Sequence, residues 1–235
     1  QRFQLITLTE RGDLAHLRNQ GLSRAHAPIT CFLDDDCVLP EGWLAGVLDT
    51  FRLRGEGCVG VSGPAIITPY YQQFRDLFRY SRLKALHDFL FVDHPELPGH
   101  LTHAGTYTTA ASSEDCAYEG PVDYLEACNF SVRTEAFKAI GGFDEAYRGI
   151  GDWSEPDASI RLRRASHGLL WFTPKATLFH QPTPGGATLL RRYDGANRLA
   201  NYHLFAHRYI KPHWRHTLYR GFLRTYYAAK GMGLV

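Results

Sequence analysis

The chain has 235 residues, 44% of them hydrophobic and 21% charged, so it is long enough for one well-buried α/β domain. No stretch approaches the roughly 18 uninterrupted apolar residues of a transmembrane helix, which argues against an integral membrane protein. The five cysteines are an odd number without a CxxC spacing. They predict neither a disulfide framework nor a zinc cluster, and they favour a reducing, cytoplasmic location.

Charge is divided unevenly along the chain. Residues 1–157 hold 13 Lys and Arg against 23 Asp and Glu, a net charge of −10. Residues 158–235 hold 13 Lys and Arg against one acidic residue, Asp194, a net charge of +12. A strongly basic C-terminal third favours a polyanionic partner such as phosphates, anionic lipid headgroups or nucleic acid.

Strands and helices are expected to alternate through most of the chain. Apolar spacing predicts strands at residues 4–8, 29–33, 58–64, 169–173 and 176–180. It predicts helices at residues 12–25, 43–51, 69–91, 134–140 and 155–167. This alternation predicts an α/β fold with a mixed, mostly parallel sheet flanked by helices. The long irregular stretch at residues 93–121 is typical of a substrate-facing loop.

The most informative local feature is the triplet Asp34-Asp35-Asp36, which follows an apolar strand. Adjacent carboxylates repel one another and resist desolvation, so a divalent cation or a cationic ligand is a common reason for placing them together. An isolated triplet is also typical of a solvated acidic turn. Its place between a strand and a helix, where open α/β sheets bind ligands, favours the ligand-binding interpretation.

Four segments occur in the order and spacing of a known family. They are residues 12–21, 32–44, 127–145 and 152–180. Together they resemble the family 2 glycosyltransferases of the GT-A fold, which transfer a sugar from a nucleotide-diphosphate donor with inversion at the anomeric carbon. The resemblance implies a GT-A-like catalytic domain over residues 1–186. Relatives open with a strand-helix-strand unit that binds the nucleobase, and we expect that unit to precede this chain.

The resemblance implies a metal and donor site at the triplet. Asp36 would ligate Mn²⁺ or Mg²⁺, and Asp34 would face the donor ribose or reach the metal through water. Asp35 would lie on the donor side. His180 matches a histidine that supplies a later metal ligand in many relatives. The alternative is that His180, one of 12 histidines in the chain, is an ordinary polar surface residue. Such a cation would stabilise the negative charge that develops on the leaving diphosphate.

The resemblance also implies a general base that takes a proton from the acceptor hydroxyl. Glu155 lies where relatives usually carry the catalytic carboxylate, and Asp157 is the second candidate. Acidic residues in the first turn of a helix also have an ordinary explanation, because they suit the positive end of the helix dipole. The assignment between the two carboxylates stays open from the sequence.

By the same resemblance, further residues lie beside the substrates. Arg18 and Asn19 would bind the donor, while the acceptor or sugar pocket would contain Glu126, Cys128, Asn129 and Trp153. Phe143 is expected in the hydrophobic core.

Residues 187–235 are predicted to form a basic, aromatic-rich helical extension of the catalytic domain. A cationic face beside an aromatic face is typical of helices that lie on anionic membrane surfaces. The alternative is an ordinary helix that packs its aromatic face onto the catalytic domain. Binding of nucleic acid is the least favoured of the three.

These observations predict an inverting, metal-dependent glycosyltransferase of polysaccharide biosynthesis, peripheral on the cytoplasmic face of the membrane. Its partners would be a nucleotide-diphosphate sugar and a glycan or lipid-linked acceptor. One alternative is a noncatalytic glycosyltransferase-like scaffold or glycan-binding module. A second is a sugar-phosphate nucleotidyltransferase, which is disfavoured because no Gly-rich phosphate loop followed by Lys occurs near the start of the sequence.

Overall fold

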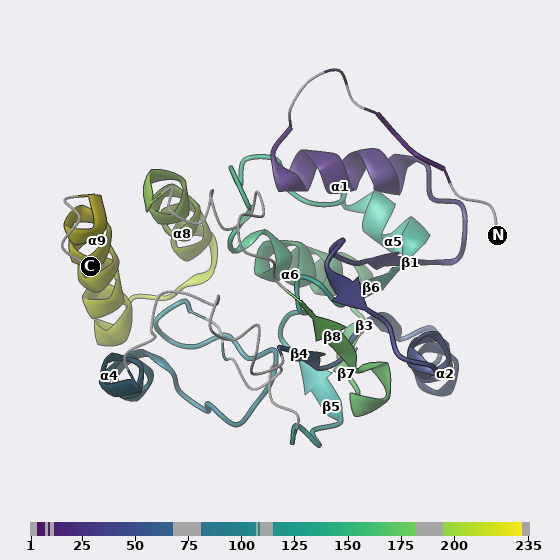
Figure 1. The fold of residues 1–235 in the computed structure, drawn as a ribbon, viewed down its shortest axis with the longest axis horizontal. Helices are drawn as coiled ribbons and strands as arrows, with labels where there is room; N and C mark the ends of the chain where they lie inside the picture. The colour runs from purple at the N-terminus through teal and green to yellow at the C-terminus, as the bar shows by residue number, and fades with distance from the viewer. Residues whose placement is uncertain are drawn as a thin grey trace.

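The computed structural model describes residues 4–7, 9, 12–67, 81–106, 108, 115–181 and 195–231. The strands are β1 (Ile29–Phe32), β2 (Cys37–Val38), β3 (Cys58–Ser62), β4 (Ala65–Ile66), β5 (Gly120–Val122), β6 (Phe130–Arg133), β7 (Leu169–Phe172) and β8 (Leu178–His180). The helices are α1 (Leu14–Ser23), α2 (Trp43–Arg54), α4 (Ser81–Phe91), α5 (Thr134–Ala139), α6 (Ser154–Ser166), the 3₁₀-helix η2 (Pro174–Ala176), α8 (Gly195–Tyr209) and α9 (Trp214–Gly231). Figure 1 shows the helices around two sheets.

The described strands form a five-stranded sheet in the order β1-β6-β3-β7-β5 and a three-stranded sheet in the order β2-β8-β4. The pairs β3 with β7 and β4 with β8 are parallel. The pairs β1 with β6, β3 with β6, β5 with β7 and β2 with β8 are antiparallel. The mixed α/β architecture is confirmed, but the predicted parallel majority does not hold among these strands.

One strand accounts for much of that difference. The segment Phe130–Arg133, which sequence reasoning treated only as part of a motif, is β6 and lies between β1 and β3, antiparallel to both. The very short strands β2 and β4 were also not predicted, and residues 4–7 form no strand. The first part of the predicted helix at residues 69–91 lies outside the described residues, and its last 11 residues are α4.

The five-stranded sheet is covered on both faces because its strands are apolar on both. In β7, Leu170 and Phe172 face the cluster formed with α1, α5 and α6, while Trp171 faces the cluster formed with α2. This alternation follows the two-residue period of a strand. Phe143, predicted as a core residue, is 1% exposed, and its ring centroid lies 5.1 Å from that of Phe32.

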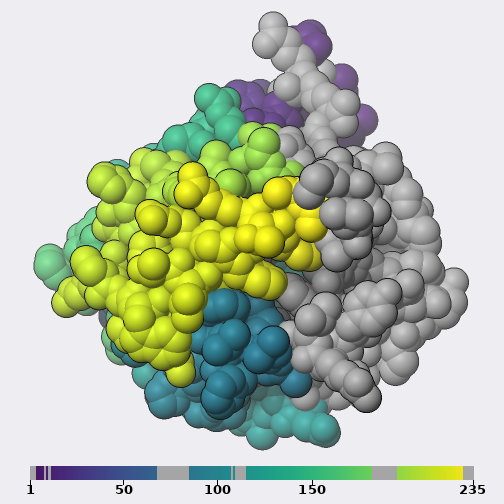
Figure 2. All heavy atoms as spheres, turned by 90° about the vertical axis from the view of Figure 1, so that its left-hand side faces the viewer, coloured from purple at the N-terminus to yellow at the C-terminus, as the bar shows by residue number. Residues whose placement is uncertain are grey.

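The C-terminal helices α8 and α9 share a third buried cluster with α4 and with the loops before α6. It contains Phe91, Ala104, Tyr147, Trp153, Tyr202, Phe205, Ala206, Tyr219 and Leu223. Figure 2 shows α9, in yellow, lying across this face next to the blue of α4. Much of the aromatic surface of the C-terminal helices therefore packs on the rest of the fold, as in the second of the three interpretations. Trp214 and Leu218 of α9 stay exposed, so docking on a membrane stays a prediction. Within the described residues, the helices are too short or too polar to span a bilayer.

Candidate active site

The acidic turn after β1, helix α1, the start of α6 and the end of β8 meet at one edge of the sheets. The turn is closed by a hydrogen bond from the amide of Cys37 to the carbonyl of Asp34, 3.2 Å long. Beyond the turn, β2 pairs with β8 so that Cys37 stands opposite His180. The backbone thus brings the triplet next to a residue that follows it by more than 140 positions in the sequence.

Asp36 and His180 are in direct contact. His180 Nε2 lies 3.0 Å from Asp36 Oδ1, and both side chains are partly exposed. With the Cys37 thiol, they offer three donor atoms that all lie within 4.8 Å of one another. Burial opposes the charged imidazole, but the Asp36 carboxylate raises the pKa of His180 above its usual value. Carboxylate and imidazole donors fit Mn²⁺, so this pair can hold the divalent cation that the sequence implied.

Arg18 joins the acidic turn to the start of α6. Its Nη1 donates to Glu155 Oε1 at 2.5 Å, and its Nη2 donates to Asp34 Oδ1 at 3.2 Å and to the carbonyl of Ala127 at 3.3 Å. The Arg18 side chain is 9% exposed. Burial lowers the pKa of Arg18, but the Glu155 and Asp34 carboxylates outweigh burial and raise it. The guanidinium therefore stays charged and fixes the positions of both carboxylates.

Glu155 is the buried carboxylate of the site. It is 7% exposed, and its Oε2 accepts a hydrogen bond of 3.1 Å from Ser154 Oγ. Burial raises its pKa above the usual value for glutamate, and Arg18 opposes that shift only in part. Each carboxylate oxygen can accept more than one hydrogen bond, so Glu155 keeps acceptor capacity. A carboxylate with a raised pKa and a fixed orientation suits general base chemistry.

Asp157, the second candidate for that role, is committed to the fold. Its side chain is fully buried and is surrounded by four donors. These are Tyr147 Oη at 3.2 Å, Tyr209 Oη at 2.7 Å, Arg161 Nε at 2.6 Å and Arg208 Nη1 at 3.0 Å. A carboxylate enclosed in this way ties α6 to α8. The structure thus separates two carboxylates that the sequence could not.

Two asparagines predicted beside the substrates have structural roles. Asn19 donates to the carbonyl of Phe143 at 2.8 Å and accepts from the amide of Phe143 at 2.9 Å. Gly142, with a φ of 69°, leaves room for this clamp, because a Cβ there would lie 2.4 Å from Asn19 Oδ1. Asn129 is fully buried and donates to the carbonyls of Gly63 and Ala176. These amides hold neighbouring segments together, and their positions beside the substrates stay predictions.

Trp153 and Cys128 also lie in the interior. Trp153 is 3% exposed, its indole nitrogen donates to the carbonyl of Gly105 at 2.8 Å, and its ring centroid lies 5.3 Å from that of Tyr202. Cys128 is 6% exposed. Its contact with the Cys37 thiol and its burial raise the pKa of Cys128, so it stays a neutral thiol. The sequence predicted both side chains in an acceptor pocket. In the structure, both are buried in the interior.

The remaining predicted residues lie at the surface of the site. Asp35 is exposed at the tip of the acidic turn. Glu126 is half-buried, and its Oε1 accepts from Tyr124 Oη at 3.4 Å. Sequence reasoning missed Cys37 as a possible donor next to Asp36. The only signal for it was adjacency to the triplet, because the two-residue strand that turns it toward His180 has no pattern of its own.

Comparisons with known proteins concern the family and the fold. The model of a family described as glycosyl transferase family 2 matches residues 1–107. No curated protein sequence matches the chain significantly.

Solved structures show the same fold. One is GalNAc-T7 with UDP, GalNAc and Mn²⁺, at a TM-score of 0.54 and 13% identity, covering 85% of this chain and 35% of that one. Another is the mannosyltransferase PcManGT from Pyrobaculum calidifontis in complex with GDP-Man and Mn²⁺, at a TM-score of 0.52 and 14% identity. That match covers 96% of this chain and 55% of the mannosyltransferase. The chain thus spans about one third of the first protein and about half of the second. At these identities the likeness is one of fold.

Proposed function

We propose that the protein is a metal-dependent glycosyltransferase, because residues 1–107 match the model of glycosyl transferase family 2 and the chain resembles solved glycosyltransferases in fold. It would move a sugar from a nucleotide-diphosphate donor to a hydroxyl group, with inversion at the anomeric carbon. The observation that carries the proposal is the position of Arg18, which joins the acidic turn and Glu155 in one site.

Asp36 and His180 would hold the cation, with Asp34 facing the donor or reaching the cation through water. When bound, a divalent cation stabilises negative charge on the diphosphate leaving group. Imidazole is a better ligand for Mn²⁺ than for Mg²⁺, which prefers oxygen donors and retained water. We therefore propose Mn²⁺ before Mg²⁺. The donors of the two solved structures, UDP and GDP-Man, leave the nucleobase open between uracil and guanine.

Glu155 would take the proton from the acceptor hydroxyl as that oxygen attacks the anomeric carbon. Its raised pKa increases its affinity for the proton, and Arg18 and Ser154 hold its orientation. Asp157 is excluded from this step because its carboxylate is enclosed by four donors. Asp35 and Glu126 stay as proposed contacts to the donor and to the sugar, since both have solvent-accessible side chains.

The acceptor we propose is a glycan or a lipid-linked glycan. Docking of residues 187–235 on a membrane is not carried into the proposal, because much of the aromatic surface of α8 and α9 is buried against α4 and the loops before α6. The predicted domain boundary at residue 186 divides the sequence, but residues on both sides of it contribute to one hydrophobic cluster.

The test is release of nucleoside diphosphate by the full-length protein from UDP-, GDP- and dTDP-sugars, with Mn²⁺, Mg²⁺ or EDTA. We expect turnover with one donor, loss of turnover in EDTA, and loss in Asp36→Asn. Asp49→Asn, which removes a half-exposed surface carboxylate on α2, is the matched control and should stay active. Turnover that survives EDTA and Asp36→Asn would overturn the metal role. No turnover with any donor would favour a noncatalytic module.

A further inference from the structure

A cavity lies away from Arg18 and Glu155, at the other end of α6. It has a volume of about 840 Å³ and is bounded by the last turns of α6, the loop at residues 101–103 and the linker between α8 and α9. Arg164 is nine residues beyond Glu155 on α6, which places it about 13 Å further along the helix axis at about 1.5 Å per residue. We call this cavity the basic pocket.

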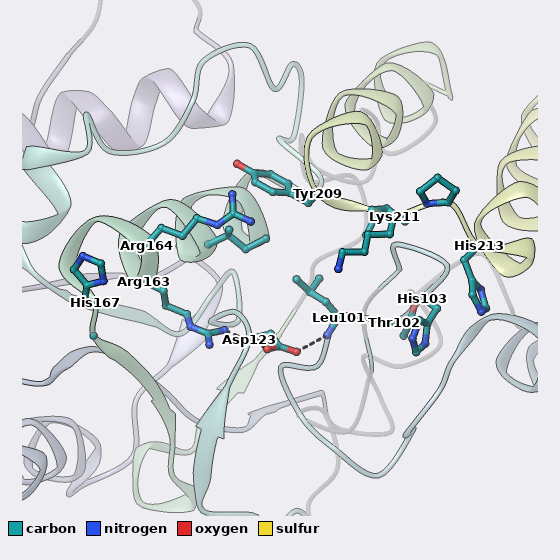
Figure 3. Close-up of a pocket in the computed structure, with 14 residues that line it drawn as sticks. Leu101, Thr102, His103, Asp123, Arg163, Arg164, His167, Tyr209, Lys211 and His213 are labelled. Carbon is teal, nitrogen blue, oxygen red and sulfur yellow. Dashed lines mark hydrogen bonds and ion pairs between the residues drawn. The ribbon is translucent and has the colours of Figure 1, made fainter.

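Cationic side chains from two distant segments converge on the basic pocket. Arg163 and Arg164 come from α6, and Lys211 comes from the linker (Figure 3). Among the described lining residues, Asp123 is the one carboxylate, and it pairs with Arg163 at 3.2 Å. Within the described part of the chain, neither Arg164 nor Lys211 has a carboxylate partner. The pocket thus carries excess positive charge that a bound anion would neutralise.

The walls of the basic pocket are held in place by partly buried contacts. Tyr209 donates its hydroxyl to Asp157 at 2.7 Å, which fixes the end of α8 against α6. Asp123 accepts from the amide of Leu101 at 3.2 Å, which fixes the loop. The Arg164 guanidinium lies 5.3 Å from the centroid of the Tyr209 ring. A pocket whose walls are already ordered loses less entropy when a ligand binds.

The chemistry of the walls indicates the class of ligand. Arginine and lysine side chains suit phosphate oxygens, and arginine can bind them through two nitrogens. Beside these cations are the apolar side chains of Leu101, Ile160, Ile210 and Pro212 and the aromatic ring of Tyr209. The volume falls in the range of about 300–1,000 Å³ that is common for small-molecule sites. A phosphate attached to a ring therefore fits better than inorganic phosphate alone.

We propose that the basic pocket binds a phosphorylated saccharide, with the phosphate between Arg164 and Lys211 and the sugar ring against Tyr209 and the apolar wall. The proposal goes beyond the transfer reaction and does not depend on it. None of the residues that line the pocket belongs to the proposed metal, donor or base site.

The test is isothermal titration calorimetry of the full-length protein with glucose 6-phosphate, without metal or nucleotide. We expect saturable binding of one molecule per chain, with glucose and inorganic phosphate each at least about tenfold weaker. Arg164→Ala combined with Lys211→Ala should weaken binding by about tenfold or more. Both residues are exposed, so the double variant should fold, as its thermal unfolding would show.

The matched control is Arg220→Ala combined with Arg224→Ala, which removes the same charge from exposed positions of α9 outside the pocket. It should bind glucose 6-phosphate as the wild type does. Vesicles containing phosphatidylinositol 4-phosphate distinguish a lipid headgroup from a soluble ligand, because only a lipid source predicts tighter binding to the vesicles. Absence of saturable binding, equal affinity for glucose, or equal weakening in the control variant would overturn the proposal.

Discussion

The first turn of α6 and its last turns differ in charge, in burial and in the partners of their side chains. Glu155 and Asp157 at the start are buried and bound by arginines and hydroxyl groups. Arg163 and Arg164 near the end face a cavity, and Arg164 is exposed. Acidic residues at the start and basic residues at the end suit the dipole of any helix.

The dipole therefore explains the signs of these charges but not their burial. The helix dipole also favours an exposed carboxylate, without the cost of desolvation. Burial of Glu155 beside one arginine, and exposure of Arg164 without a carboxylate, are the features that the dipole does not require. They indicate chemistry at the first end and ligand binding at the other.

Of the variants that test the comparison between the two ends of α6, Glu155→Gln should have the largest effect. Loss of a general base typically lowers the rate by about 10²–10⁴-fold, and we expect a decrease in kcat of that size with little change in KM. The measurement is initial-rate kinetics with the donor that supports turnover in the panel described above. The Asp36→Asn variant, assayed for Mn²⁺ binding, provides the contrast, because Glu155→Gln should leave metal affinity unchanged. Full activity in Glu155→Gln would show that Glu155 is not the general base.

Replacement of Asp157 by alanine should act on stability instead. It leaves Arg161 and Arg208 without their buried carboxylate partner, a change that typically costs about 3–5 kcal/mol of unfolding free energy. Urea denaturation measures this, and Asp49→Ala, at a surface ion pair, should change stability by less than about 0.5 kcal/mol. A variant that is as stable as the wild type yet inactive would instead give Asp157 a part in the reaction.

The acidic limb of the pH–activity profile tests the environment of Glu155. A base works when deprotonated, so activity falls as pH drops through the folded-state pKa. Because burial raises that pKa, the limb should lie at higher pH than for an ordinary glutamate. Arg18→Met removes the opposing charge and should move the limb higher still. A limb at the ordinary glutamate position would show that water reaches the carboxylate.

Replacement of Trp153 by phenylalanine should have the smallest effect. It keeps most of the ring packing against Tyr202 but removes the indole donor to the carbonyl of Gly105. We expect a loss of about 1 kcal/mol in unfolding free energy, measured by thermal or urea denaturation. Trp214→Phe, at a 55% exposed tryptophan, is the control and should change little. A loss of activity without a loss of stability would return Trp153 to the substrate pocket.

Much of the fold could be predicted from periodicity. The helices with several apolar turns and the strands β1, β3 and β7 lie close to where their patterns place them. Strands of two residues, such as β2, have no period to detect. Strand β6 was missed because its segment was interpreted through a motif and not through its apolar alternation. Without β6, the two antiparallel pairings that join β1 to β3 could not be predicted.

The residues of the candidate site could also be predicted only in part. Arg18, Asp36, Glu155 and His180 come together as their order in the sequence implied. Asn19, Asn129 and Asp157 belong to the same motifs but hold the backbone in place. A motif marks residues that a fold family needs, and only hydrogen-bond partners and burial separate those that hold the chain from those that can meet a substrate.

The left-handed backbone of Trp153, with a φ of 68°, sets where α6 begins, two residues before Glu155. Its ring is buried against Tyr202 of α8, so the start of α6 and the C-terminal helices share one hydrophobic cluster, and we expect them to unfold together. Deletion of those helices would expose the tryptophan and release the carboxylate from its position. An inactive truncation would then report loss of order at Glu155, even if no residue beyond α6 ever contacts a substrate.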